Sequence, residues 1–200
     1  MTVLPRAIAW QRTDTTGGEY VGFNDRRGLI ARGVAFSADP AVYSCRYELS
    51  TDDEWVSTRF EATAEGAGWL RTLRMERAAG RWRVTTAEQG NLNAVVQSAP
   101  FPGSEEPGRL TDALDVDLYA SPLTNTLPIR RLGLLGQPAG TTRTITAAWI
   151  LLPSLAVLPL EQTYTVLGEG QLRYSSNGFT ADLDIDEDGL VVRYPGLATR

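Results

Sequence analysis

Apolar and polar residues alternate in short segments along most of the chain. In residues 114–118, Leu-Asp-Val-Asp-Leu, a period of two places Asp115 and Asp117 on one face of a strand and the apolar residues on the other. The same period returns in 141–146 and in 162–185, where Gly and Asn-Gly turns separate the segments. The pattern predicts a half-buried strand at 114–118 and antiparallel strands after it.

Turn residues also divide the first half of the chain into short segments. Residues 1–65 contain Gly-Gly, Asn-Asp, Arg-Gly and Asp-Pro pairs between runs rich in Val, Tyr, Phe and Thr, a spacing typical of antiparallel meanders. Residues 56–86 fit either a helix that ends at Gly80 or a hairpin that turns there. Residues 87–113 lack a clear period and are rich in Gly, Pro, Ser and Glu, so we expect a long loop or an irregular edge.

A short helix is predicted directly after the 114–118 strand. Ser121 is a good N-cap, and Pro122 would occupy the first helical position, where its missing N–H has no partner to lose. Pro128 leaves two starts open, because a helix that begins at Ser121 must kink, whereas one capped by Asn125 takes the proline within its first turn. The second start is the one we expect. Gly133 can adopt the left-handed conformation that ends the helix.

The longest apolar run, 147–160, is interrupted by Pro153 and Pro159. Its length is well short of the roughly 20 residues that a transmembrane helix needs, so it predicts no membrane span. Residues 149–152 are apolar at every position, which indicates a strand that contacts the core on both faces. A ligand or a membrane on one face is the alternative.

The composition of the chain excludes several classes of function. A chain of 200 residues is long enough for one domain with a full core, and we expect a single domain over 1–200. The formal charge of −5 argues against nucleic-acid binding, which needs a basic surface. All 19 basic residues are arginine and there is no histidine. This excludes a serine–histidine relay, a histidine–zinc site, a Schiff-base lysine and a P-loop lysine within the chain.

Cys45 is the single cysteine, so the chain has no internal disulfide. It lies in an alternating segment and no histidine can activate it, so we expect a core residue rather than a nucleophile. The N-terminal sequence lacks the charged start, apolar run and small-residue cleavage site of a secretory signal, which leads us to expect a cytoplasmic location.

Two groups of acidic residues are candidates for chemistry. Asp184, Asp186, Asp188 and Gly189 follow the spacing of the first half of an EF-hand loop, but the twelfth position is Pro195 instead of a bidentate Glu and the flanks predict strands. The sequence therefore predicts an acidic turn and no metal site.

Asp115 and Asp117 should lie about 6 to 7 Å apart, a separation that a pair of glycosidase carboxylates can have. Solvation, or ion pairing with Arg130 and Arg131 of the adjacent helix, is the simpler interpretation. Acid–base catalysis stays open as the alternative, and burial would favour it by raising one pKa.

Several segments together resemble one protein family. The run SPLTNTLPIRRL at 121–132, the preceding Asp-Val-Asp-Leu, the stretch PSLAVLPLEQTY at 153–164 and the C-terminal YSSNGFTADLDIDEDGLVVRYPGLATR resemble the bacterial putative glycolipid-binding family, a former domain of unknown function. The resemblance implies a mainly β, single-domain spiral β-roll in which a long antiparallel sheet wraps around one short helix at about 122–133. It favours the hairpin for 56–86. It also implies that the chain can form a homodimer.

The residues predicted to bind a ligand lie in these matched segments. Amide and hydroxyl groups can hydrogen-bond to sugar hydroxyls, arginine can bind an anionic headgroup, and tyrosine can stack on a sugar face. Helix capping, salt bridges and strand packing are the structural alternatives for the same side chains. The predicted ligand-binding residues are Ser121, Asn125, Thr126, Arg130, Arg131, Gln162, Tyr164, Tyr174 and Tyr194.

Three functions are compatible with the sequence. The first is a non-catalytic lipid- or glycolipid-binding carrier that holds an amphipathic small molecule in or beside the roll, without a metal or other cofactor. The second is a cofactor-independent hydrolase or isomerase that uses Asp115 and Asp117. The third is a dimeric structural or interaction module.

Overall fold

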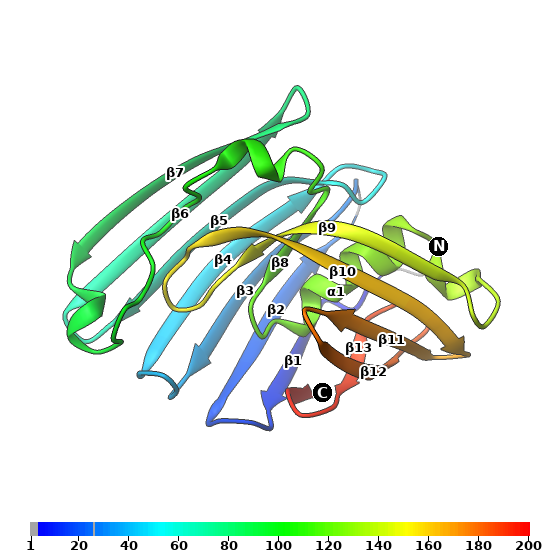
Figure 1. The fold of residues 1–200 in the computed structure, drawn as a ribbon. Coiled ribbons are helices and arrows are strands. Elements are labelled where there is room, and N and C mark those ends of the chain that lie inside the picture. Colours follow the sequence, from blue (N-terminus) through cyan, green and yellow to red (C-terminus); the bar gives the residue numbers. More distant parts are fainter. Residues whose placement is uncertain (1–3, 26) are drawn as a thin grey trace.

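The first and last strands of the chain pair with each other at the centre of one continuous sheet. In this computed structural model, which describes residues 4–25 and 27–200, the strand order is β7-β6-β5-β4-β3-β2-β1-β14-β13-β12-β11-β10-β9-β8. The middle of the chain therefore forms both edges. The sheet curls so that β9 and β10 pass across the other half, with the helix α1 between the two layers (Figure 1). The predicted mainly β fold with a long sheet around one helix is confirmed.

The first half of the sheet is a meander of hairpins. Its strands alternate between inward apolar and outward polar side chains, as in β4, where Tyr43, Cys45, Tyr47 and Leu49 are buried. Cys45 is fully buried, which confirms the core prediction. The strands are β1 (Ala7–Arg12), β2 (Gly17–Asn24), β3 (Ile30–Ser37), β4 (Tyr43–Thr51), β5 (Ser57–Gly66), β6 (Trp69–Ala78) and β7 (Arg81–Gly90).

The hairpin prediction for 56–86 is confirmed. Strands β6 and β7 turn at Ala79 and Gly80, which both have positive φ, of 50° and 75°. Two-residue turns with this backbone match the right-handed twist of the flanking strands.

The loop prediction for 87–113 holds from residue 91 onward but was wrong for 87–90, which extend β7. The loop contains the 3-10 helices η1 (Leu92–Ala94) and η2 (Pro107–Leu110), whose Leu92 and Leu110 are fully buried and anchor it.

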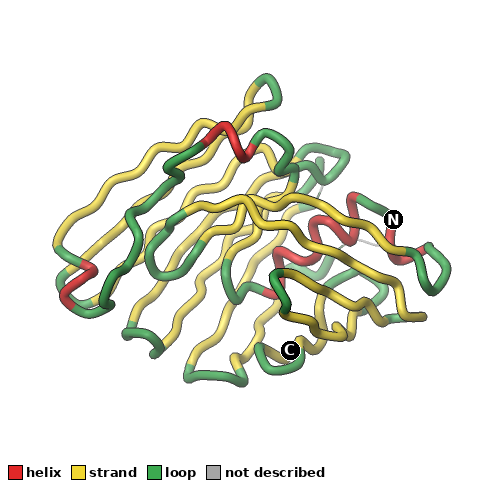
Figure 2. Tube along the Cα trace, viewed as in Figure 1, coloured by secondary structure: helices red, strands yellow, loops and turns green. Residues whose placement is uncertain are grey.

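The second half of the sheet holds the remaining strands. These are β8 (Asp115–Leu118), β9 (Thr142–Ile150), β10 (Val157–Gly168), β11 (Gln171–Ser176), β12 (Phe179–Ile185), β13 (Val191–Tyr194) and β14 (Ala198–Thr199). Strand β8 pairs with β9 in parallel, so the predicted antiparallel sheet has one parallel edge. Figure 2 shows how little of the chain outside these strands is helical.

Strand β8 is buried on both faces, so the prediction of a half-buried strand was wrong. Val116 and Leu118 belong to the apolar core, as expected, but Asp115 on the other face is only 1% exposed. The helix covers that face, and the Arg131 guanidinium binds the Asp115 carboxylate through bonds of 3.0 and 2.6 Å. A period of two reports which residues share a face, but it cannot report that a second layer covers the polar one.

The helix α1 (Pro122–Arg131) begins earlier than expected. Ser121 is its extended N-cap residue and Pro122 its first residue, so the predicted start at Asn125 was wrong. Pro128 lies inside the helix, where a proline costs about 3 kcal/mol. Every residue from 122 to 129 is buried, and we infer that this packing offsets the proline. Gly133 follows with φ 60° and ψ 36°, the left-handed geometry that was predicted, and η3 (Leu134–Gly136) comes next.

Two apolar clusters occupy the space between the layers. The larger cluster packs the inner face of β1–β7 against β8, the end of β9 and the α1 residues Leu123 and Leu127. The smaller one packs Ile129 and Leu134 against β10–β13. Trp10 joins the halves, because its indole N–H donates to the Val191 carbonyl at 2.7 Å.

Candidate functional site

A pocket of about 390 Å³ lies at the N-terminal end of α1. Four connections of the fold meet there: the turn from β8 to α1, the β1–β2 turn, the β11–β12 hairpin and the β13–β14 turn. Its volume is within the range that small-molecule sites have. The lining residues are Asp14, Asp117, Leu118, Tyr119, Ala120, Ser121, Asn125, Trp149, Leu160, Tyr174, Ser176, Asn177, Phe179, Tyr194, Gly196 and Leu197.

A larger and more open groove, of about 760 Å³, crosses the outer face of β2–β7. None of the residues predicted from the sequence to bind a ligand lines that groove within the described chain. The pocket beside α1 is therefore the candidate site.

Aromatic rings make up much of the pocket wall. The rings of Tyr174, Phe179 and Tyr194 lie 6.2 to 6.3 Å from one another, and those of Tyr119 and Trp149 lie 6.4 Å apart. Tyr119 is 40% and Phe179 50% exposed, so these two large apolar side chains are open to solvent. Rings with open faces can stack on a sugar or attract a cation.

The Asp117 carboxyl is the polar centre of the pocket. Its two oxygens accept one bond each, from the Thr124 hydroxyl at 2.9 Å and from the Gln162 side-chain amide at 2.6 Å. Burial raises the pKa of Asp117 to about 6, the two hydrogen bonds lower it, and the neighbouring Asp115 raises it further. Both donors are neutral, so this carboxylate is desolvated without a counter-ion among the contacts of the described chain.

Two buried side chains behind the pocket hold this arrangement in place. The Tyr164 hydroxyl donates to the Asn125 side-chain oxygen at 3.1 Å and lies 3.4 Å from the Gln162 side-chain oxygen. Burial raises the pKa of Tyr164 well above its usual value, so it stays a donor. The Gln162 side chain turns its NH₂ towards Asp117, because a carboxylate can only accept a hydrogen bond.

A second buried carboxyl lies directly beneath the helix N-terminus. Glu19 of β2 accepts from the Ser121 and Tyr47 hydroxyls, both at 2.5 Å. Burial raises the pKa of Glu19 to about 7, while the bonds from Ser121 and Tyr47 lower it. Both bonds end on Oε1, and the buried Oε2 has no hydrogen-bond partner in the described chain. Ser121 does not cap the helix with its own hydroxyl, so a carboxyl from the opposite layer takes the position where helix amides and the dipole favour negative charge.

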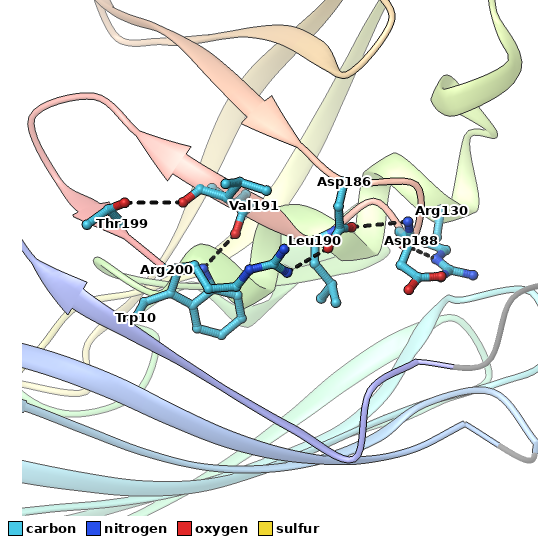
Figure 3. Close-up of polar contacts among 9 residues, drawn as sticks. Trp10, Arg130, Asp186, Asp188, Leu190, Val191, Thr199 and Arg200 are labelled. Atoms are coloured by element: carbon cyan, nitrogen blue, oxygen red, sulfur yellow. Dashed lines mark hydrogen bonds and ion pairs between the residues drawn. The ribbon is translucent and has the colours of Figure 1, made fainter.

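The predicted arginines lie outside the pocket. Arg131 is paired with Asp115, which confirms the ion-pair interpretation for that carboxylate. Arg130 contacts Asp188 (Figure 3). Its guanidinium donates to the Asp188 carbonyl at 2.6 Å and to the Asp188 carboxylate at 3.3 Å. Its guanidinium also lies 5.0 Å from the Trp55 ring centroid. Both arginines of the C-terminal half of α1 are thus paired with carboxylates, and an anion-binding role stays a prediction for them.

The other predicted residues fall into three groups. Ser121, Asn125, Tyr174 and Tyr194 line the pocket. Gln162 and Tyr164 lie behind it and contact its lining through hydrogen bonds. Thr126 is fully buried on α1, and in the described part of the chain its hydroxyl has no hydrogen-bond partner. A binding role stays a prediction for all of them.

The sequence did not reveal Tyr119, Trp149, Phe179 and Asn177 as lining residues. Trp149 lies in a run apolar at every position, which was attributed to the core on both faces, yet this side chain is only partly buried. Asn177 was recognised only as part of a turn. The signal that could have found the site is the large aromatic side chain beside each of two turns, Tyr119 before Ala120 and Phe179 after Gly178.

Comparisons with known proteins give one family and one solved structure. A family model described as putative glycolipid-binding matches residues 7–200. A crystal structure of a DUF1089 family protein from Pseudomonas aeruginosa is similar, with a TM-score of 0.72 and 25% sequence identity. The alignment covers 100% of this chain and 98% of that one. No curated protein matches.

Proposed function

Since the chain belongs to the family described as putative glycolipid-binding, we propose that it is a non-catalytic carrier that holds the headgroup of an amphipathic lipid, such as a glycolipid, in the pocket beside α1. The observation that carries this proposal is the combination of open aromatic rings with a buried carboxyl in one pocket of headgroup size. A sugar ring can stack on the aromatics while its hydroxyls donate to Asp117 and Asn125.

An apolar strip beside the pocket offers a place for the lipid tail. Trp149 contacts the Tyr119 ring, and Leu158 lies directly opposite Trp149 on the adjacent strand. Leu158 is 45% exposed. We define Tyr119, Trp149 and Leu158 as the apolar strip. The interior of the roll is occupied by the two clusters, so the proposal places the tail along this surface instead of inside the sheet.

The energetics of such a complex are modest. A buried CH₂ contributes about 0.8 kcal/mol, but a tail that lies on a surface buries only part of its area. After the loss of rotational and translational freedom, we expect an affinity that is roughly micromolar or weaker. Weak binding suits a protein that must release its ligand.

Binding can be tested by isothermal titration calorimetry of the delipidated protein with octyl β-D-glucoside below its micelle concentration. Saturable binding is expected, and Trp149→Ala should weaken it about tenfold or more because both the stacking ring and part of the strip are lost. Phe36→Ala is the matched control, since Phe36 is 52% exposed on the outer face and does not line this pocket. Absence of saturable binding to the wild-type protein, or equal loss in both variants, would contradict the proposal.

Catalysis by Asp115 and Asp117 is less well supported by the geometry. Asp115 does not line the pocket, and its carboxylate is held by Arg131. Of these two carboxylates Asp117 alone lines the pocket, whereas glycoside hydrolysis by two carboxylates needs both beside the scissile bond. Turnover of a glycoside panel that is lost in both Asp117→Asn and Asp115→Asn would reverse this preference.

A further inference from the structure

The charged groups around the pocket are distributed unequally. Among its described lining residues the ionisable acids are Asp14 and Asp117, and none is an arginine. Arg12 donates two hydrogen bonds to Asp14, of 2.7 and 2.5 Å, so the charges of these two side chains offset each other. An incoming anion would therefore meet no available cation within the described lining.

The helix N-terminus, which commonly binds anions, is also closed to a ligand. The Glu19 carboxyl already lies beneath it and accepts from the hydroxyl of the N-cap residue Ser121. A phosphate or carboxylate headgroup would lie near this buried carboxyl and near Asp117. Like charges this close in a poorly solvated site repel strongly.

A cation, in contrast, could pair with the Asp117 carboxylate, which has no counter-ion among the contacts of the described residues. Asp14 is paired with Arg12 and Asp115 with Arg131, but the contacts to Asp117 come from the neutral Thr124 and Gln162 side chains. Aromatic rings on the same pocket add a second attraction, because their faces carry negative charge density. A protonated amine on the ligand would supply the missing counter-ion in a place where the rings also favour it.

We propose that the pocket selects amphiphiles whose headgroup carries a protonated amine over otherwise identical neutral or anionic ones. This inference rests on the proposed function, because it specifies the headgroup for the same pocket. It commits to an amine-bearing headgroup such as an amino sugar. It also assigns Asp117 as the residue that determines the preference.

Three octyl glycosides that differ in one substituent provide the test. Octyl β-D-glucoside is neutral, octyl 2-amino-2-deoxy-β-D-glucoside is cationic, and octyl β-D-glucuronide is anionic. Titration calorimetry at about pH 7 should give an affinity at least tenfold higher for the amino sugar than for the glucoside, and the glucuronide should bind most weakly. A tenfold ratio corresponds to about 1.4 kcal/mol, a magnitude typical of a charge-assisted hydrogen bond.

The Asp117→Asn variant should bring the ratio of amino-sugar to glucoside affinity towards one. The variant can keep the local bonds, since an asparagine oxygen can accept from Gln162 while its NH₂ donates to Thr124, whose hydroxyl donates to the Ser121 carbonyl. Asp182→Asn is the charge-matched control. Asp182 lies on β12 outside the pocket lining, paired with Arg173, and its loss changes the net charge equally.

A pH series adds an independent readout. Thr124 and Gln162 donate hydrogen bonds to Asp117. The charged group beside it on β8 is Asp115, which is paired with Arg131, and the Asp14–Arg12 pair lies at the β1–β2 turn. The titratable groups from the other strands are the tyrosines of β10, β11 and β13, which are Tyr164, Tyr174 and Tyr194. These tyrosines stay neutral because burial raises their pKa values. Glu19 of β2, which Ser121 contacts from the pocket, also titrates, with a pKa of about 7. The pH series is therefore repeated in Glu19→Gln, where the decline of the amine preference towards about pH 5 should remain because it reports Asp117, whose pKa is about 6.

The possible results separate this inference from the function beneath it. Equal binding of all three glycosides, tightest binding of the glucuronide, or a preference that survives Asp117→Asn would overturn the inference while the carrier function stands. Binding of none of them would overturn both. A preference that disappears in Asp117→Asn but persists in Asp182→Asn would support it.

Discussion

Replacing Asp117 by asparagine should stabilise the protein at neutral pH. The carboxyl is desolvated and receives only neutral donors, so its charged form is held less favourably in the folded state than in water. Asparagine has nearly the same shape, resembles the neutral acid at every pH, and can keep both hydrogen bonds. The substitution therefore removes the desolvation cost without opening a cavity.

The magnitude follows from the pKa. Folding raises the Asp117 pKa from 3.8 to about 6, so its contribution to stability is fully present below the unfolded-state pKa and is lost as the pH rises through about 6. At about 1.4 kcal/mol per unit, the loss is about 3 kcal/mol above that pH. Contact with pocket solvent reduces it, and we expect Asp117→Asn to gain about 2 kcal/mol at pH 7.5 and much less at pH 4.5, with a rise in Tm of roughly 4 to 8 °C at the higher pH.

The assay is urea unfolding of both proteins at a series of pH values, with Tm from calorimetry as a second measure. Asp182→Asn serves as control, because that exposed aspartate is paired with Arg173 and its pKa is lowered instead of raised. A variant that is no more stable than the wild type at pH 7.5, or one whose gain does not vary with pH, would refute the idea that Asp117 is a desolvated acid. It would also weaken the case for a cation at this site.

Three further predictions concern groups outside the pocket. Folding raises the Glu19 pKa from 4.5 to about 7, so the wild-type protein should lose stability as the pH rises from about 4.5 to 7. Glu19→Gln should abolish this loss, which urea unfolding at a series of pH values measures. Arg71 is fully buried and binds Glu88 and the Pro100 and Ser154 carbonyls. Arg71→Met should therefore lower the free energy of unfolding by about 3 to 5 kcal/mol and speed proteolysis of the 92–110 loop. Arg74→Met, on the outer face, is the control and should change both little. The Thr126 hydroxyl has no hydrogen-bond partner in the described chain, whereas the Thr124 hydroxyl has two. Thr126→Val should therefore leave the stability unchanged or raise it by about 1 kcal/mol, and Thr124→Val should lower it. Equal effects of the two substitutions in thermal unfolding would contradict this.

The parts of the fold that could be predicted are those encoded in neighbouring residues. Alternation and turn residues gave the hairpins, including the turn at Ala79 and Gly80. The proximity of the 114–118 strand to the helix gave the ion pair between Asp115 and Arg131. Periodicity within a strand and spacing along a helix are local, so they survive without knowledge of the rest of the chain.

The wrong predictions concern features that depend on segments distant in the sequence. The helix starts at Pro122 because packing on all sides outweighs Pro128, and because Glu19, 102 residues away from Ser121, serves its N-terminus. Asp117 was recognised as a candidate acid but not as the centre of a pocket, since its partner Gln162 lies on β10 and the other walls of the pocket come from β9 and β11–β13. Which rings meet there depends on how the sheet curls, and no local pattern records that.

The pairing of β1 with β14 has a consequence for the connectivity of the sheet. Apart from this seam, each strand lies beside its neighbour in sequence, so the sheet consists of two runs of sequential strands joined through β1 and β14, antiparallel except for the β8–β9 pair. The seam closes the longest loop in the molecule, and its entropy cost should make it a late step in folding. A gene rearranged to start within the 91–114 connection, with the original ends linked, would encode a sheet in which the order of the strands in space is the same as their order in the sequence.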